Sequence, residues 1–224
     1  MKFPIPKVIY MCHKVLDKIE IYSQKWKLLN PEYQIQLYDD NRCRYFLMKE
    51  YPPIFVKIFD FIPDGPIKAD FWRVCIINKY GGVYVDADIN PLVPLRDYIS
   101  DDDWFVTCIS NNFINTSNNN ILNFNPHIIM AKKNNIILRR VIQNYIYYYR
   151  RRNHPFFKYS YWGWSICKFL RIPNVFKKKS QVLYQNGKKI KLLLELPDMN
   201  TCVYGGRPVL KNRYRFYKNH NFIR

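Results

Sequence analysis

Hydrophobic and polar positions in the first fifty residues switch between two periods. The run IPKVIYMC, residues 5–12, is apolar and β-branched, and residues 33–38 alternate apolar with polar side chains, so both predict strands. Apolar residues at positions 21, 26 and 29 predict a helix between them, which Pro31 ends. Asp39 or Asp40 is suited to cap a further helix that runs to about Tyr51, before two prolines. This alternation of strands and helices favours a layered α/β fold with a parallel sheet.

The clearest helix follows in the middle of the chain. Gly65 permits a turn, Pro66 fits a first helical position, and the pattern continues to the stop at Gly81 and Gly82. The short run VYV, residues 83–85, then predicts a strand. Residues 91–99 predict a loop and a short helix, and residues 103–110 predict another strand.

The second half of the chain is less regular. Residues 110–125 are rich in Asn and predict a loop or a loosely packed hairpin. Apolar and aromatic side chains at positions 137, 141, 145 and 148 predict a helix with a basic C-terminal end. Residues 189–196 predict a late strand, whereas residues 212–224 are basic, aromatic and irregular. No internal repeat or linker is visible, so we expect residues 1–224 to form one compact α/β domain.

Composition supports a folded protein. The 224 residues are 48% hydrophobic and 17% aromatic, which argues against disorder across the chain. No secretory leader is visible, and no run reaches the roughly 18 apolar residues that a membrane helix needs. The six cysteines are scattered without a CxxC pair, which gives little support for zinc and favours free buried thiols in a reducing compartment. We therefore expect a cytoplasmic protein, in the host cytoplasm if the source is a virus.

The chain is strongly basic, with 36 Lys and Arg against 17 Asp and Glu and a net charge of +19. The densest basic clusters lie at residues 150–152, 177–179 and 188–189. This charge is typical of a solvated basic surface, or of attraction to nucleic acid, anionic lipid headgroups or phosphate-bearing small molecules.

Two aspartates stand out against this basic background. Asp86 and Asp88 follow the strand at 83–85, and in an extended segment residues two apart point to the same side while Ala87 points away. Two adjacent carboxylates repel each other unless a cation lies near them. Mg²⁺ or Mn²⁺ suits such a pair, because each accepts a few carboxylates and fills its other positions with phosphate oxygens and water. Ligands of open α/β sheets bind at this carboxyl end of the strands.

The helix before this strand carries a second polar pair, Asp70 and Arg73, three residues apart on one face. A surface ion pair is one interpretation. The neighbouring residues are mostly apolar, however, which favours partial burial and a role in holding a polar ligand.

The stretch KADFWRVCIINKYGGVYVDADINPL, residues 68–92, resembles the sugar-binding DXD region of glycosyltransferase family 32. That family includes capsular-polysaccharide glycosyltransferases and initiating mannosyltransferases of yeast. The opening segment, with IPKVIYMC and later NPEYQIQLYDD, resembles the start of the same family, so the resemblance covers residues 4–110. The positions that match the DXD pattern are Ala69, Asp70, Arg73, Gly81, Gly82, Tyr84, Asp86 and Asp88.

The resemblance implies a GT-A fold, in which a Rossmann-like, mostly parallel sheet flanked by helices binds a nucleotide-sugar and, usually, Mn²⁺. It implies that residues 1–110 form the nucleotide-sugar-binding half and residues 111–224 the acceptor half. Asp70 would hold hydroxyls of the donor sugar, with Arg73 on the sugar or the diphosphate. Asp86 would face the ribose or sugar, often through the metal, and Asp88 would be the more direct metal ligand. The remaining implied nucleotide contacts are Ile9, Tyr10, Met11 and Tyr84.

The sequence departs from the family pattern at several points. Tyr10 stands where the family has its opening His, with His13 three positions later. The family often has a Gly-Pro element in its second half, and residues 160–167 are the nearest candidate for it here. This segment contains Trp162 and Trp164, which we expect either to stack on an acceptor sugar or to lie in the core. His220 is a candidate third metal ligand, and Lys218 or Arg215 on the same tail a candidate contact for the diphosphate.

These observations predict a metal-dependent, retaining glycosyltransferase that moves a hexosyl or N-acetylhexosaminyl group from a UDP- or GDP-sugar to a glycan, glycoprotein or other acceptor. A nucleotidyltransferase acting on sugar phosphates also uses paired carboxylates, but it needs a further carboxylate and a phosphate-gripping Gly/Ser motif that are not evident here. A basic polyanion binder without catalysis would leave Asp70, Arg73 and the two aspartates unexplained, and no base-reading motif is present.

Overall fold

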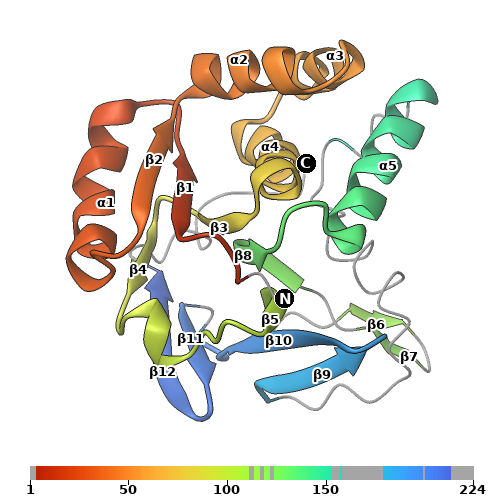
Figure 1. Ribbon diagram of the computed structural model, residues 1–224. Coiled ribbons are helices and arrows are strands. Elements are labelled where there is room, and N and C mark those ends of the chain that lie inside the picture. Colours follow the sequence, from red (N-terminus) through yellow and green to blue (C-terminus); the bar gives the residue numbers. More distant parts are fainter. Residues whose placement is uncertain are drawn as a thin grey trace.

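The computed structural model describes residues 4–110, 114–116, 119–121, 124–152, 157, 179–198 and 200–212 (Figure 1). The helices of these segments are α1 (Leu16–Leu29), α2 (Asp40–Glu50), α3 (Ile54–Phe61), α4 (Gly65–Tyr80), α5 (Ile136–Arg150) and a 3₁₀ turn (Leu95–Asp97). The strands are β1 (Val8–Cys12), β2 (Gln34–Tyr38), β3 (Gly82–Val85), β4 (Ile89–Pro91), β5 (Asp103–Ile109), β6 (Ile114–Thr116), β7 (Asn119–Ile121), β8 (Phe124–Ala131), β9 (Gln181–Gln185), β10 (Lys188–Glu195), β11 (Thr201–Tyr204) and β12 (Arg207–Asn212).

Ten of these strands form one sheet in the order β2-β1-β3-β8-β5-β10-β11-β12-β4, with β9 added beside β10. The expectation of parallel pairing holds for β1 with β2 and β3, and for β5 with β10. The other pairings within the sheet are antiparallel, so the sheet is mixed rather than mostly parallel. The physical reason is the short turns that join β9 to β10 and β11 to β12, since a two-residue connection reverses the chain.

The sheet curls strongly on itself. β3 and β4 are joined by only three residues, 86–88, although β4 pairs with β12 at the far end of the sheet order. Six strand spacings would separate β3 from β4 by about 29 Å in a flat sheet, whereas the chain from residue 85 to residue 89 reaches at most about 14 Å. The curl therefore brings the far edge of the sheet back beside β3, and the two aspartates lie in the link between them.

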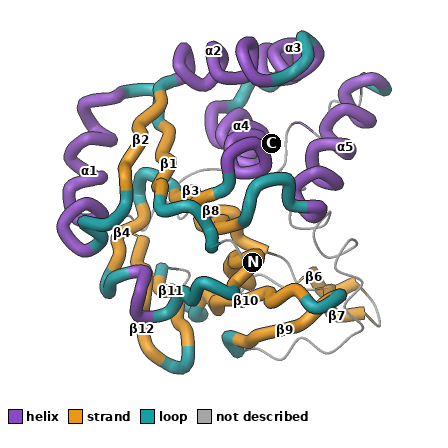
Figure 2. Tube along the Cα trace, in the orientation of Figure 1, coloured by secondary structure: helices purple, strands orange, loops and turns teal. Residues whose placement is uncertain are grey.

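Helices cover both faces of the β1-β2-β3 region, with α1 on one side and α2 to α5 on the other (Figures 1 and 2). The buried side chains divide accordingly into two hydrophobic clusters. One contains Ile19 and Trp26 of α1 with Ile9 and Met11 of β1, and the other contains most of α4 with parts of α2, α3 and α5. Because most of α4 is buried, its polar residues Asp70, Arg73 and Asn78 are held inside the protein rather than at its surface.

The N-terminal elements agree with the sequence pattern. Asp39 caps α2 by accepting a hydrogen bond from the backbone N–H of Arg42 at 2.7 Å. Gly81 ends α4 and Gly82 begins β3, with φ angles of +72° and +109°. A Cβ on Gly82 would lie 2.8 Å from the carbonyl oxygen of Val8, so this sharp connection between helix and strand requires glycine.

Several elements were not predicted from the sequence. They are α3, β4, β9, β11 and β12, together with β8, which follows the predicted Asn-rich loop or hairpin directly. The hairpin itself is present as β6 and β7. No helix among the described residues is long and apolar enough to cross a membrane.

Candidate functional site

The two aspartates lie in a tight turn rather than on an extended strand. β3 ends at Val85, and the N–H of Ile89 donates a hydrogen bond to the carbonyl oxygen of Asp86 at 3.1 Å, which closes the turn. The expectation that extended geometry brings the pair together is therefore wrong, although Ala87 does turn inward and is buried. Asp86 and Asp88 are both partly exposed, so their carboxylates are accessible to a ligand.

Arg73 of α4 links the helix to this turn. Its Nη2 atom lies 2.9 Å from Asp70 Oδ1 and 3.0 Å from Asp86 Oδ1, so one guanidinium nitrogen serves both carboxylates. Nη1 donates to the carbonyl oxygen of Pro126 at 2.6 Å, and Nε donates to that of Ala69 at 3.2 Å. The structure thus brings together three of the residues predicted to form the site, in a network that removal of the arginine would break.

Tyr84 completes the support of Asp86. Its hydroxyl donates to Asp86 Oδ1 at 2.8 Å, and the Arg73 guanidinium lies over its ring at 4.5 Å from the centroid. The Asp86 N–H donates to the carbonyl oxygen of His127 at 2.9 Å, which fixes the backbone as well as the side chain. Asp86 is therefore held in one orientation by three elements, β3, α4 and β8.

The surroundings of Asp88 disfavour its negative charge. Burial, and then the negative charge of Asp86, raise the pKa of Asp88 to about 6, although nearby His127 and Arg73 act in the opposite direction. Burial alone would lower the pKa of Arg73, but the negative charges of Asp86 and Asp70 raise it above the usual range, so the guanidinium stays charged. The site is consequently a place where an added cation would be stabilised.

The chemistry of Asp86 and Asp88 fits a divalent cation. Hard carboxylate oxygens are the ligands that Mg²⁺ and Mn²⁺ prefer, and a cation beside Asp88 would relieve the repulsion that raises its pKa. Asp86 keeps 29% of its side chain exposed while Arg73 and Tyr84 hold one of its oxygens.

The other predicted contacts occupy different positions. Ile9 and Met11 are fully buried, Tyr10 is 3% exposed and Tyr84 is 1% exposed, so their side chains pack in the core near the site rather than lining an open surface. The carboxyl ends of β1 and β3 nevertheless lie side by side, because these strands are parallel neighbours. The predicted residues Trp162, Trp164, Lys218 and His220 lie outside the described residues, as does Arg215.

The contribution of β8 to the site has no counterpart in the sequence pattern. Thr107 and Cys108, which are consecutive on β5, pair with Ile129 and Asn125 of β8. The three residues of β8 between these partners, 126–128, therefore have no ladder partner on β5 and form a bulge. This bulge turns the carbonyls of Pro126 and His127 toward Arg73 and Asp86. Backbone acceptors leave no residue-type pattern that a reader of sequence can find.

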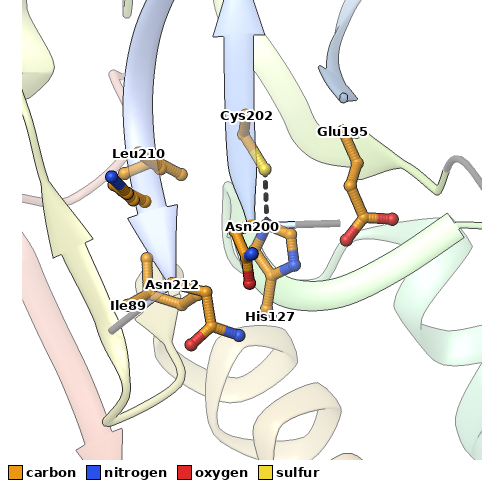
Figure 3. A pocket seen from close by; sticks show the side chains of 8 residues that line it. Ile89, His127, Glu195, Asn200, Cys202, Leu210 and Asn212 are labelled. Atoms are coloured by element: carbon orange, nitrogen blue, oxygen red, sulfur yellow. Dashed lines mark hydrogen bonds between the residues drawn. The ribbon is translucent and has the colours of Figure 1, made fainter. Parts of the chain in front are cut away.

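On its other side the bulge presents the His127 ring to a buried thiol. Nε2 of His127 lies 3.1 Å from Sγ of Cys202 on β11, as Figure 3 shows, and the Cys108 thiol lies 3.4 Å from Cys202. The hydrogen bond from Cys108 and the charge of His127 lower the pKa of Cys202 to about 6. Burial alone would lower the pKa of His127, but Cys202 raises it to about 9. The two groups therefore form a thiolate–imidazolium pair.

The region that contains the two aspartates is similar to a known family of sequences. Residues 17–106 match the family model described as "Glycosyltransferase sugar-binding region containing DXD motif". The chain is 33% identical over 106 residues to the "Initiation-specific alpha-1,6-mannosyltransferase" of Candida albicans, covering 43% of this chain and 28% of the relative. It is 35% identical over 100 residues to "Inositol phosphoceramide mannosyltransferase 3" of Schizosaccharomyces pombe, covering 42% of this chain and 28% of the relative. The matched part thus spans just over a quarter of these relatives.

A solved structure titled "PaToxG Glycosyltransferase" has a similar fold, with a TM-score of 0.55 at 14% identity over 75% of this chain and 71% of that one. This likeness confirms the predicted GT-A fold. The match at residues 17–106 shows that this part of the chain is similar to the DXD region of glycosyltransferases, in agreement with the resemblance seen in the sequence.

Proposed function

We propose that this chain is a metal-dependent, retaining glycosyltransferase that transfers a sugar from a UDP- or GDP-sugar to a glycan, glycoprotein or other acceptor. The family match supports glycosyl transfer, while the metal, the donor and the stereochemistry are our inferences. The observation that carries the proposal is the arrangement of Arg73, whose Nη2 lies within 3.0 Å of both Asp70 and Asp86 beside the partly exposed Asp88.

Asp86 and Asp88 are the residues that would hold Mn²⁺ or Mg²⁺. A divalent cation bound there supplies positive charge that neutralises the diphosphate of the leaving group. Arg73 is 3% exposed, so it acts as a positioning residue that orients Asp86. Asp70, 5% exposed, acts through the same guanidinium in the described conformation. Preorganised charges of this kind need no rearrangement when the sugar–phosphate bond breaks.

A transfer reaction that retains the anomeric configuration of the sugar needs no separate general base beside the acceptor hydroxyl. The chemistry then depends on holding the diphosphate and the oxocarbenium-like sugar in place. This agrees with a site that contains carboxylates and an arginine rather than an isolated base. His220, Lys218 and the two tryptophans stay predictions for the acceptor half, residues 111–224.

The sugar that we propose first is mannose. Both fungal relatives named above are mannosyltransferases by name. GDP-mannose is accordingly the first donor to test, with UDP-glucose, UDP-galactose and UDP-N-acetylglucosamine as comparisons.

The experiment measures release of the nucleoside diphosphate from each donor, with Mn²⁺, with Mg²⁺ and with EDTA. We expect one donor to be hydrolysed or transferred in a metal-dependent way. Asp86→Asn and Asp88→Asn should each lower the rate by about two to three orders of magnitude, the usual cost of losing a charge-stabilising group. Asp101→Asn, which changes an exposed aspartate in a surface turn, is the matched control and should retain the wild-type rate.

Wild-type rates in both site variants would refute the proposal, and so would donor turnover that EDTA leaves unchanged. Formation of a nucleotide-sugar from a nucleoside triphosphate and a sugar phosphate would instead support nucleotidyl transfer. A retained anomeric configuration in the product, followed by NMR, tests the stereochemical part separately.

A further inference from the structure

Cys108, His127 and Cys202 come together from three strands, β5, β8 and β11, in the interior of the protein. Their exposed fractions are 0%, 6% and 3%, and their ligand atoms all lie within 4.8 Å of one another. These residues take no part in the proposed transfer reaction. Two thiols and an imidazole are the ligands that bind zinc and related soft or borderline metals.

Two of the three separations in this cluster are close to those of a tetrahedral zinc site. Bond lengths of about 2.3 Å to sulfur and about 2.0 Å to nitrogen place two sulfurs about 3.8 Å apart, and a sulfur and a nitrogen about 3.5 Å apart. The observed separations are 3.4 Å between Cys108 and Cys202 and 3.1 Å between Cys202 and His127. Movements of a few tenths of an ångström would bring these two pairs to the coordination distances, and the Cys108 thiol and the His127 ring, which lie within 4.8 Å of each other, would approach by up to about 1.3 Å.

A disulfide explains the close sulfurs less well. β10 lies between β5 and β11 in the sheet, so two strand spacings, about 9.6 Å in a flat sheet, separate the backbones of Cys108 and Cys202. Disulfides require Cα atoms less than about 7 Å apart. Curling of the sheet shortens this distance, but both thiols are free in the structure, with their sulfur atoms 3.4 Å apart.

A small cavity of about 10 Å³ adjoins the cluster and provides space for a fourth ligand (Figure 3). His127, Cys202, Glu195 and Asn200 line it, so a water held there would have polar partners. The Glu195 carboxylate accepts hydrogen bonds from Ser110 and Asn125 at 3.0 and 2.9 Å and adds negative charge beside the site. That charge favours a bound cation.

We propose that Cys108, His127 and Cys202 bind one zinc ion at a structural site separate from Asp86 and Asp88. The site goes beyond the proposed glycosyl transfer and does not depend on it. A metal there fixes the β8 bulge, because His127 supplies its ring to the cluster and its carbonyl to Asp86. The scattered spacing of the cysteines hides this arrangement in the sequence.

The test uses Co²⁺ as a spectroscopic substitute for zinc, titrated into the full chain after dialysis against a chelator under reducing conditions. We expect one equivalent to bind with a near-ultraviolet sulfur-to-cobalt charge-transfer band and the visible bands of tetrahedral cobalt, and added Zn²⁺ should displace it. Cys202→Ala should abolish the charge-transfer band, and Cys108→Ala should reduce it to about half or less, since thiolates produce it.

Cys75→Ala is the matched control, because Cys75 is also fully buried but lies on α4 outside the cluster, and it should keep the full band. Asp88→Asn should keep it too, which separates this site from the aspartate pair. A wild-type protein without the charge-transfer band overturns the proposal whether or not the variants fold. A band that survives Cys202→Ala, or that is lost in Cys75→Ala with the fold intact, also overturns it.

Discussion

Asp88→Asn is expected to stabilise the metal-free protein at neutral pH while it removes the proposed activity. The reason is that Asp88 is ionised in a place that disfavours its charge. Burial and the neighbouring charge of Asp86 raise its pKa from 3.8 to about 6. An asparagine of nearly the same shape removes both the repulsion and the desolvation of a charge.

The size of the gain follows from the pKa. Each unit of pKa corresponds to about 1.4 kcal/mol, so the difference between 3.8 and about 6 corresponds to about 3 kcal/mol at most. Because Asp88 is partly exposed, solvent screens some of this penalty. We expect Asp88→Asn to increase the free energy of unfolding by about 1–2 kcal/mol at pH 7.5.

Because folding raises the pKa of Asp88, the stability of the wild type depends on pH. A group whose pKa is higher in the folded state binds its proton more tightly there. Its contribution to stability is complete below about pH 4 and is lost as the pH rises through about 6. The asparagine does not titrate, so its advantage over the wild type should shrink as the pH falls, to about a third of the neutral value at pH 4.5.

The assay is urea unfolding followed by tryptophan fluorescence, with EDTA present, at pH 7.5 and pH 4.5. Asp101→Asn is the control, because it makes the same change of charge at an exposed position of this basic protein. Adding Mn²⁺ should raise the unfolding midpoint of the wild type but not of Asp88→Asn, since only the folded protein with both carboxylates binds the ion.

Two results would refute this reasoning. If Asp88→Asn is no more stable than Asp101→Asn at pH 7.5, Asp88 carries no electrostatic penalty in the folded state. If a gain is present but equal at both pH values, its cause is not the ionisation of Asp88. Equal stabilisation of wild type and variant by Mn²⁺ would place the metal elsewhere.

Two further changes test the support of the site. Arg73→Met should cost about 3–5 kcal/mol in urea unfolding, because it leaves the buried carboxylate of Asp70 without its cation and removes one partner of Asp86; a loss below about 1 kcal/mol would contradict the buried network. Tyr84→Phe should cost about 1 kcal/mol and lower donor turnover, because the 2.8 Å hydrogen bond to Asp86 is lost. Tyr184→Phe, at a position 71% exposed, should change neither quantity, and equal effects of both substitutions would contradict the proposed role of Tyr84.

The sequence predicted the first half of the fold well because its signals are local. Period-two alternation marked β2, Asp39 marked the start of α2, and the Gly81-Gly82 pair marked the end of α4. Each of these signals depends on residues next to each other in the chain. The helix α3 was missed because two prolines at positions 52 and 53 indicate a break, whereas Pro53 precedes the helix and leaves its hydrogen bonds intact.

The strands of the second half were missed for a different reason. β8 follows an Asn-rich segment and contains Pro126, which normally argues against a central strand. Here the proline lies in the bulge at residues 126–128, where the ladder between β8 and β5 is interrupted, so the strand loses little by lacking its N–H. β11 and β12 are short, and their pairing is fixed by tertiary contacts that sequence patterns do not show.

The residues of the candidate sites likewise divide into those that could be predicted from local sequence and those that could not. Asp70, Arg73, Asp86 and Asp88 were found because they lie close together in the sequence with spacings that have chemical meaning. The thiols and the imidazole were not, since His127 and Cys202 are 75 residues apart and meet only when the sheet curls. The expected lack of a zinc site followed from spacing alone, and the described structure brings Cys202 into contact with both His127 and Cys108.

The bulge of β8 connects the two candidate metal sites through a single stretch of backbone. Adjacent carbonyls, of Pro126 and His127, accept hydrogen bonds from Arg73 and from the Asp86 N–H, while the His127 side chain contacts Cys202 on the other side. Because the ring and the two carbonyls belong to neighbouring residues, a metal that holds the ring would also restrict the backbone of the bulge. Removal of a metal from the thiol site should therefore loosen Asp86 and weaken binding of Mn²⁺ at the aspartates, although no ligand is shared between them.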